Sequence, residues 1–193
     1  MRRAFWIVGL AWVLVGCGAR SAVPPEPGYE RGGIPDLAGA RVMVLPVQLG
    51  GGAFPELDTE IAYAFDRTGD QTTWLFAEEL DQAISRNPGF DLAVRNLPVR
   101  ALLAPEVERL GDPVFAQVYR LAALTSSGYA LLPIEARETA GSAGVFIELT
   151  ATLVDTRSGF ILWLGVVRGA EAPEGDVLLA ATVAEALALE VAP

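Results

Sequence analysis

The sequence predicts an α+β domain in which a mixed, mostly antiparallel sheet packs against helices. Three observations support this fold class. A nearly all-apolar, β-branched run covers residues 41–47, two alternating segments at 145–155 and 160–168 are joined by a tight turn, and stretches of helical spacing lie between and after these strands. The predicted order is β-α-β-α-α-β-β-β-α.

The N-terminal residues have the pattern of a secretory signal peptide. Arg2 and Arg3 precede an apolar run over residues 4–15, and the only cysteine of the chain follows shortly after it. The end of this run resembles the lipobox of bacterial lipoproteins, with Leu14, Val15, Gly16 and Cys17. The resemblance implies that residues 1–16 are removed and that Cys17 is lipidated on sulfur and acylated as the new N-terminus.

Two alternatives for this segment are an uncleaved transmembrane helix and a secreted protein with a free thiol. The apolar run is shorter than the roughly 18–20 residues that cross a bilayer, and an unpaired reactive thiol outside the cytosol is unusual. Lipidation explains a single cysteine, because two or three acyl chains at about 0.8 kcal/mol per buried methylene give a lasting anchor in the bilayer.

The residues after Cys17 indicate where such a lipoprotein would reside. Gly18 and Ala19 follow with no acidic residue, a pattern similar to outer-membrane sorting in lipoprotein families, so we expect a lipid-anchored protein of the cell envelope at the outer membrane, facing the periplasm. Residues 17–38 are predicted to be the acylated cysteine and a flexible tether, whose Pro- and Gly-rich part at 20–36 reaches at most some 50–60 Å. Residues 39–193 form a single predicted domain.

The composition excludes several functions. The formal net charge is −10 and the chain has no lysine, which argues against nucleic-acid binding. It has no histidine either, so the commonest general base and metal ligand is missing. Acids such as Asp66 and Asp70 fit no calcium-loop spacing, and the glycines at 50–52 lack the helix and lysine of a phosphate loop. We therefore expect no catalytic residue, no metal and no cofactor.

The N-terminal half predicts fewer regular elements than the C-terminal half. After the strand at 41–47, residues 48–71 lack periodicity and are expected to form a long connection. Such a loop in a compact domain is usually functional or mobile. Its aromatic and acidic side chains are therefore candidates for partner contact, namely Phe54, Asp58, Tyr63 and Phe65.

The middle of the chain predicts two helices with a short strand between them. Residues 72–86 have helical spacing, with Asp70 or Thr72 as the cap and a stop at 87–89. Residues 90–94 are expected to be a strand, and 98–111 are ambiguous, with one or two helical turns around 106–110. The pair at 112–113 is a good helix start, so a helix is expected to run to Ser126.

The C-terminal third predicts a three-stranded meander and a helix. The strands are residues 129–138, 145–155 and 160–168, separated by turns at 141–144 and 155–159. Asp176 then opens a closing helix. Its expected inward-facing residues are Val177, Leu179, Ala180, Val183, Leu187 and Val191.

Three segments resemble one family of envelope proteins. Residues 42–47 have its V-x-V-L-P-V strand, residues 128–134 resemble its A-D-x-V-L-x-G strand, and residues 153–163 resemble its L-V-D-x-x-T-G-x-x-L-W hairpin. The family comprises the curli-secretion channel lipoprotein, the lipoprotein activators of peptidoglycan synthases and the N-terminal domain of the Tol-system propeller protein. The resemblance spans residues 41–191 and implies an anticodon-binding-domain-like sandwich.

The function indicated is a membrane-anchored, periplasm-facing lipoprotein that acts as a non-catalytic interaction module of an envelope assembly, with an envelope protein as partner. The alternative is a subunit of an oligomeric outer-membrane ring or export complex, formed with other copies of the chain. A pore itself is disfavoured, because the sequence has no spare pair of alternating 9–11-residue strands. The third alternative is a cell-wall enzyme.

Overall fold

The computed structural model describes residues 25–26, 28–68 and 71–192, so the predicted signal peptide, the predicted lipobox and Cys17 lie outside the described residues. The strands are β1 (Glu30–Gly32), β2 (Arg41–Val44), β3 (Thr73–Leu75), β4 (Tyr129–Ala140), β5 (Val145–Asp155) and β6 (Ile161–Arg168). The helices are α1 (Leu57–Asp66), α2 (Ala77–Ser85), α3 (Val114–Thr125) and α4 (Leu178–Val191), with short 3-10 helices η1 (Gly51–Ala53) and η2 (Val99–Leu103).

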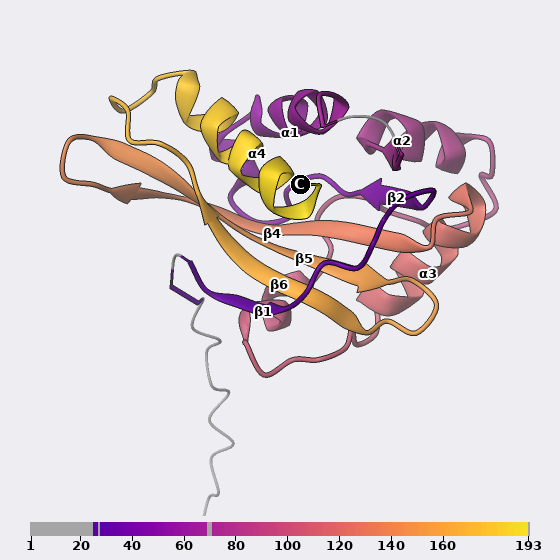
Figure 1. Cartoon of the computed structure of the whole chain (residues 1–193). Coiled ribbons are helices and arrows are strands. Elements are labelled where there is room, and N and C mark those ends of the chain that lie inside the picture. The colour runs from indigo at the N-terminus through magenta and orange to yellow at the C-terminus, as the bar shows by residue number, and fades with distance from the viewer. Residues whose placement is uncertain (1–24, 27, 69–70, 193) are drawn as a thin grey trace, which may run out of the picture.

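The described strands form one six-stranded mixed sheet in the order β1-β6-β5-β4-β2-β3 (Figure 1). The β4–β5, β5–β6 and β1–β6 pairs are antiparallel, whereas β2 runs parallel to both β3 and β4. The predicted α+β class with a mixed, mostly antiparallel sheet is confirmed.

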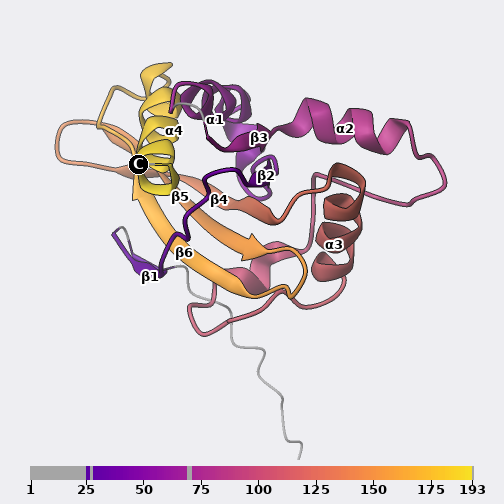
Figure 2. The same ribbon diagram turned by 45° about the vertical axis from the view of Figure 1, so that its right-hand side comes forward.

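Both faces of the sheet are covered. Helices α1 and α4 pack on one face, and α3 with η2 packs on the other, with α2 beside α3 (Figures 1 and 2). Each interface has its own apolar core: Trp163 and Leu187 are fully buried on the α1/α4 side, and Leu132 and Leu103 are buried on the α3 side. Burying a side chain of this size contributes about 1.5–3 kcal/mol.

The double coverage explains the buried polar side chains of β5. Thr150 and Thr152 lie on the face away from α4 and are at most 1% exposed. A buried hydroxyl without a partner would be destabilising, and the hydroxyl of Thr152 donates to the carbonyl oxygen of Trp163 at 2.7 Å.

The prediction that residues 48–71 form an irregular connection is wrong. The segment contains η1 and the ten-residue helix α1. Leu57, Ile61, Ala64 and Phe65 repeat at helical spacing and bury one side of α1 against α4 and the sheet. The acidic residues between them, Asp58 and Glu60, are half-buried, and they interrupt the apolar pattern, so the segment looks polar and aperiodic in the sequence.

Two further expectations in this half are corrected. Residues 73–75 are the parallel edge strand β3, so the helix expected from residue 72 starts only at Ala77. Its first turn is capped by the Glu79 carboxylate, which accepts from the backbone N–H of Phe76 at 3.0 Å, and not by Thr72; Asp70, the other expected cap, lies outside the described residues. Residues 90–94 form no strand, and the ambiguous stretch forms η2 at 99–103 rather than turns at 106–110.

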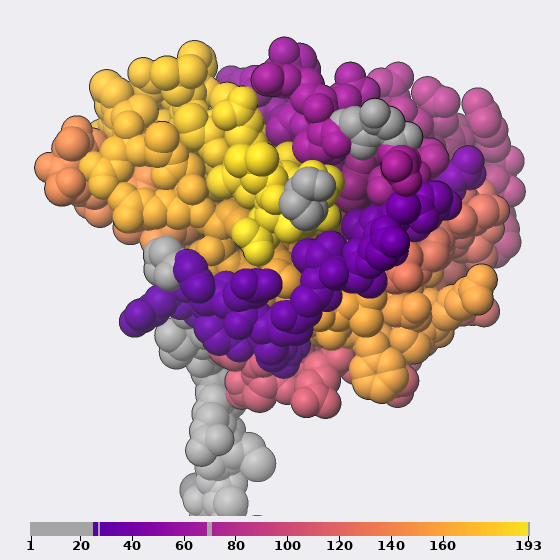
Figure 3. Space-filling model, in the orientation of Figure 1, coloured from indigo at the N-terminus to yellow at the C-terminus, as the bar shows by residue number. Residues whose placement is uncertain are grey.

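The folded region begins before residue 39, inside the predicted tether. Strand β1 pairs antiparallel with β6, and the Arg31 guanidinium donates hydrogen bonds to the carbonyl oxygens of Pro105 and Val107. Gly32, at φ +83°, permits the backbone to approach Leu162 so closely that a Cβ would collide with its carbonyl oxygen. Figure 3 shows this N-terminal segment, in indigo, lying along the surface beside α4.

The C-terminal elements agree with the sequence, with one exception. Strands β4, β5 and β6 and helix α4 lie within a few residues of their predicted bounds. Val177, expected to face inward, precedes the helix and is 77% exposed. Among the described residues, no helix combines the length and the apolar character needed to cross a membrane.

Candidate partner-contact surface

The structure separates the four residues that the sequence groups for partner contact. Phe65 is 1% exposed and packs edge-to-face against Trp74, with ring centroids 4.6 Å apart. Phe54 is partly buried against the same core. The carboxylate of Asp58 accepts from a backbone N–H three residues after β2, at 2.8 Å, and so fixes the start of α1. Only Tyr63, 60% exposed, is fully available to a partner.

Tyr63 lies beside a groove between the C-terminal parts of α1 and α4. The cavity there has a volume of about 600 Å³ and is lined by Ala64 and Ala188 together with Leu189, which is 70% exposed. Across its mouth, Arg67 and Glu185 form an ion pair with an N–O distance of 3.5 Å. The Arg67 guanidinium also lies over the Tyr63 ring, 5.6 Å from its centroid.

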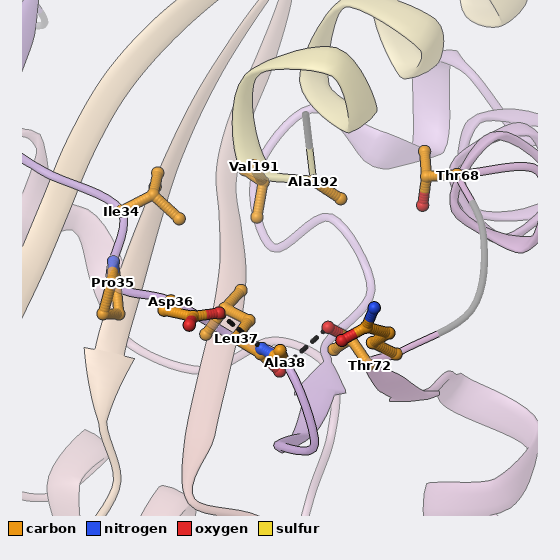
Figure 4. A pocket seen from close by; sticks show the side chains of 10 residues that line it. Ile34, Pro35, Asp36, Leu37, Ala38, Thr68, Thr72, Val191 and Ala192 are labelled. Atoms are coloured by element: carbon orange, nitrogen blue, oxygen red, sulfur yellow. Dashed lines mark hydrogen bonds between the residues drawn. The ribbon is translucent and has the colours of Figure 1, made fainter.

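The groove continues into a second cavity of about 590 Å³ at the ends of the two helices (Figure 4). Thr68 and Ala192 line both cavities, and residues 34–38 form the opposite wall of the second one. The two cavities and their rim together form the α1/α4 groove. Its members are Ile34, Pro35, Asp36, Leu37, Ala38, Tyr63, Ala64, Arg67, Thr68, Gln71, Thr72, Glu185, Ala188, Leu189, Val191 and Ala192.

The wall at 34–38 is held by local hydrogen bonds. The Ala38 N–H donates to the Asp36 carboxylate at 2.9 Å, and the Thr72 hydroxyl donates to the Leu37 carbonyl oxygen at 3.0 Å (Figure 4). Because this segment is tied to the loop before β3, the groove is preformed, and an occupant does not have to order its wall.

The chemistry of the groove suits binding through apolar contact. Small alanines leave room for an inserted side chain, Leu189 and Tyr63 offer exposed apolar surface, and the Arg67–Glu185 pair supplies polar groups at the rim. Within the described residues, no three or more His, Cys, Asp or Glu side chains gather in a way that would hold a metal ion.

Sequence reasoning missed the contribution of α4 and of residues 34–38. One signal was available: Leu189 falls off the inward-facing positions of the closing helix, so an exposed leucine could be anticipated. No comparable signal marks residues 34–38, because their role depends on contacts with the far end of the chain.

Comparison with known proteins gives similarities of fold only. No protein-family model matches the sequence, and no curated protein matches it. Among solved structures, the chain is similar to the PelC dodecamer from Paraburkholderia phytofirmans, with a TM-score of 0.45 and 16% identity over 86% of this chain and 96% of that one.

It is also similar to the lipoprotein GNA1162 from Neisseria meningitidis, with a TM-score of 0.41 and 16% identity over 71% of this chain and 84% of that one. The C-terminal domain of LpoB from Escherichia coli gives a TM-score of 0.39 and 18% identity over 70% and 85% of the two chains. With TM-scores below 0.5, these neighbours carry no argument about the site.

Proposed function

We propose that the protein is a non-catalytic interaction module of the bacterial cell envelope, anchored by acylated Cys17 and docked on a partner protein through the α1/α4 groove. The observation that carries the docking step is a cavity between α1 and α4 that is lined by alanines and the exposed Leu189, with the exposed Tyr63 beside it. The anchor rests on the lipobox-like sequence that ends at Cys17.

A short tether would keep the domain near its membrane. Because the described pairing starts at Gly28, whose N–H donates to the Val166 carbonyl oxygen, roughly 11 residues separate Cys17 from the fold. At about 3.3 Å per residue they reach at most about 36 Å. This is shorter than the reach expected for a tether that ends at residue 38, so the domain acts close to the bilayer surface.

The groove accounts for affinity through a few residues. Covering a leucine-sized side chain contributes about 1.5–3 kcal/mol, and a small number of such anchors dominates a typical protein interface. Leu189 and Tyr63 are the anchors on this chain, while the exposed Arg67–Glu185 pair at the rim favours orientation over affinity.

The anchor is tested by fractionation of cells that produce the Cys17→Ser variant. We expect the wild-type protein in the membrane fraction and the variant outside it, with mass spectrometry showing acyl chains on residue 17 of the wild type. Unchanged membrane retention of the variant, or an unacylated Cys17, contradicts the anchor.

The groove is tested by a photo-crosslinking amino acid placed at position 63 in intact cells. We expect one partner protein to be captured, and we expect Leu189→Glu to abolish the capture because it puts a charge where the partner buries apolar surface. The matched control is Val177→Glu, at an equally exposed apolar residue before the other end of α4. Equal capture by both variants would refute the groove as the docking surface.

A further inference from the structure

A second exposed surface lies where β5 turns into β6, on the α3 side of the sheet. It joins three segments that are far apart in sequence: the stretch before α3, the outer side of α3 and the β5–β6 turn. We name it the turn-end patch, and its members are Arg109, Phe115, Tyr119, Ser126, Arg157 and Phe160.

The patch exposes aromatic rings that the fold does not need to bury. Tyr119 is 52% and Phe160 is 47% exposed, and the Phe115 and Tyr119 ring centroids lie 5.9 Å apart. The Arg109 guanidinium stacks over the Phe160 ring, 4.0 Å from its centroid. Grouped exposed aromatic rings of this kind mark contact surfaces.

The turn that carries Arg157 and Phe160 is rigid. The Asp155 carboxylate accepts hydrogen bonds from the Ser158 N–H and hydroxyl, each at 2.7 Å, and from the Arg157 N–H at 3.1 Å. Gly159, at φ +73°, lies against the Phe115 ring, 2.7 Å from where its Cβ would be. The backbone of the turn is therefore held in place before any partner arrives.

A cavity of about 370 Å³ opens beside the rings. It is lined by Tyr119 and Arg157, by the end of α3 and by Thr156. Ser126 also lines it, in the left-handed conformation at φ 56° that glycine normally occupies after a helix. A non-glycine residue in this conformation is mildly strained, and the exposed Ser126 places a hydroxyl at the cavity.

The charge of the patch is opposite to that of the chain. The formal net charge is −10, yet Arg109 and Arg157 form no ion pair with a carboxylate anywhere in the described part of the chain. The carboxylate of Asp155 on the turn accepts from the N–H groups of Arg157 and Ser158 and from the Ser158 hydroxyl; the charge of Arg157 acts on it, but the two side chains form no ion pair. The guanidinium groups are therefore available to an anionic partner.

We propose that the turn-end patch binds a partner polypeptide segment that carries a carboxylate next to an apolar side chain. The carboxylate pairs with the Arg157 guanidinium at the cavity, which offers planar, bidentate recognition. The apolar side chain packs on the Tyr119 and Phe160 rings, and the Ser126 hydroxyl donates to a carbonyl oxygen of the segment.

The charge of the chain favours a polypeptide over an anionic bilayer surface. With a formal net charge of −10 the protein is repelled by a uniformly anionic surface, whereas a single carboxylate can reach Arg157 at the cavity. The exposed Tyr119 and Phe160 rings offer the apolar contact for a side chain next to that carboxylate.

The recognition chemistry is tested on the full mature chain in detergent micelles by NMR titration of backbone amides. The probes are N-acetyl-leucine, which has a free carboxylate, and N-acetyl-leucine amide, which has none. At millimolar concentration we expect the first probe to shift the amide signals of residues 126–128 and 156–158. The second probe, which lacks the carboxylate, should have an affinity at least about tenfold lower.

Two charge variants complete the titration. Arg157→Gln removes the proposed guanidinium partner of the carboxylate and should lower the affinity for the first probe by about tenfold. Arg86→Gln removes an equally exposed arginine from the end of α2 and should leave binding unchanged. No shift at the patch with the carboxylate probe, or equal binding of both probes, overturns the recognition chemistry.

The source of the segment is tested by a photo-crosslinking amino acid at position 160 in intact cells, followed by mass spectrometry of the crosslinked peptide. Capture of another protein's peptide with Asp, Glu or a C-terminus near the crosslink, lost in Arg157→Gln, is the expected result. Capture of a glycan, a lipid or a second copy of this chain overturns the proposal. Neither measurement depends on Leu189 or Cys17, so its failure is distinct from failure of the proposed function.

Discussion

Replacing Phe65 by alanine distinguishes a core residue from a partner-contact residue. The sequence groups Phe65 with Tyr63 as a surface side chain. In the structure, Phe65 is 1% exposed, because its ring on α1 is covered by β3 and by the residue before α2. Its ring packs edge-to-face with Trp74 at 4.6 Å and with Phe76 at 6.5 Å. Phe65→Ala therefore leaves a cavity under the α1/α4 groove, while Tyr63→Ala removes only exposed surface.

The expected magnitudes differ several-fold. A buried phenylalanine truncated to alanine lowers the free energy of unfolding by about 3–5 kcal/mol, and the lost aromatic pair adds about 0.5–1.5 kcal/mol. For Tyr63→Ala the only specific loss is the exposed contact with Arg67, which is about 0.5–1 kcal/mol. A domain of this size has only about 5–15 kcal/mol in total, so Phe65→Ala should be close to unfolding.

The assay is urea denaturation of the purified mature protein in detergent micelles, followed by tryptophan fluorescence. Trp74 lies against Phe65 and therefore reports on the same cavity. We expect a large fall in the denaturation midpoint for Phe65→Ala and a small one for Tyr63→Ala. Partner capture per folded molecule should be unchanged for Phe65→Ala and reduced for Tyr63→Ala. Unfolding free energies of the two variants within about 1 kcal/mol of each other would refute the placement of Phe65 in the core.

Three further changes have expected outcomes. Gly165→Ala places a Cβ against the indole of the fully buried Trp163 and should lower the unfolding free energy by about 1–3 kcal/mol, measured by thermal denaturation. Desolvation raises the pKa of Asp155, but hydrogen bonds from Ser158 and Arg157 outweigh it and leave the pKa below its usual range. The stabilisation by this carboxylate is therefore present above about pH 4 and lost as the pH falls further, so the stability gap between Asp155→Asn and wild type, about 1 kcal/mol at neutral pH, should close in acid. A gap that is constant from pH 7 to acid contradicts this reasoning. Arg67→Gln breaks an ion pair whose side chains are 60% and 59% exposed and also removes the contact with the Tyr63 ring, and its unfolding free energy in urea should fall by no more than about 1 kcal/mol.

The C-terminal half could be predicted from sequence because its signals are local. In β5 and β6 the alternation of side chains and the Asp155–Gly159 turn chemistry are contained within a few residues. Each strand pairs with its neighbour in the chain, so no distant contact is needed to define it. The predicted bounds of this meander therefore agree closely with the structure.

The N-terminal half depends on distant contacts. Helix α1 is short, and it is stabilised by packing against α4, more than 110 residues later, rather than by its own composition. Strand β1 has three residues and forms only through its antiparallel pairing with β6. At 73–75 the helical spacing is equally compatible with a strand, and parallel pairing with β2 decides the outcome.

The candidate site shows the same division. Tyr63 could be named from sequence because an aromatic residue among acids is conspicuous, but the groove also needs Leu189 and residues 34–38, which only the fold brings together. Phe65 lies two residues from Tyr63 and is also aromatic, but it is a core residue whereas Tyr63 is exposed. Neither composition nor spacing distinguishes the two until the helix and its buried side are known.

The two proposed contact surfaces are independent because the sheet lies between them. The α1/α4 groove is built on one face and the turn-end patch on the α3 side, with a separate apolar core under each (Figure 2). They share no residue, and effects at distant sites without common partners add. One copy of the domain can therefore hold two partners at once at a fixed separation. A rigid sheet transmits that spacing between the partners, which is a mechanical role that needs neither a reaction nor a conformational change.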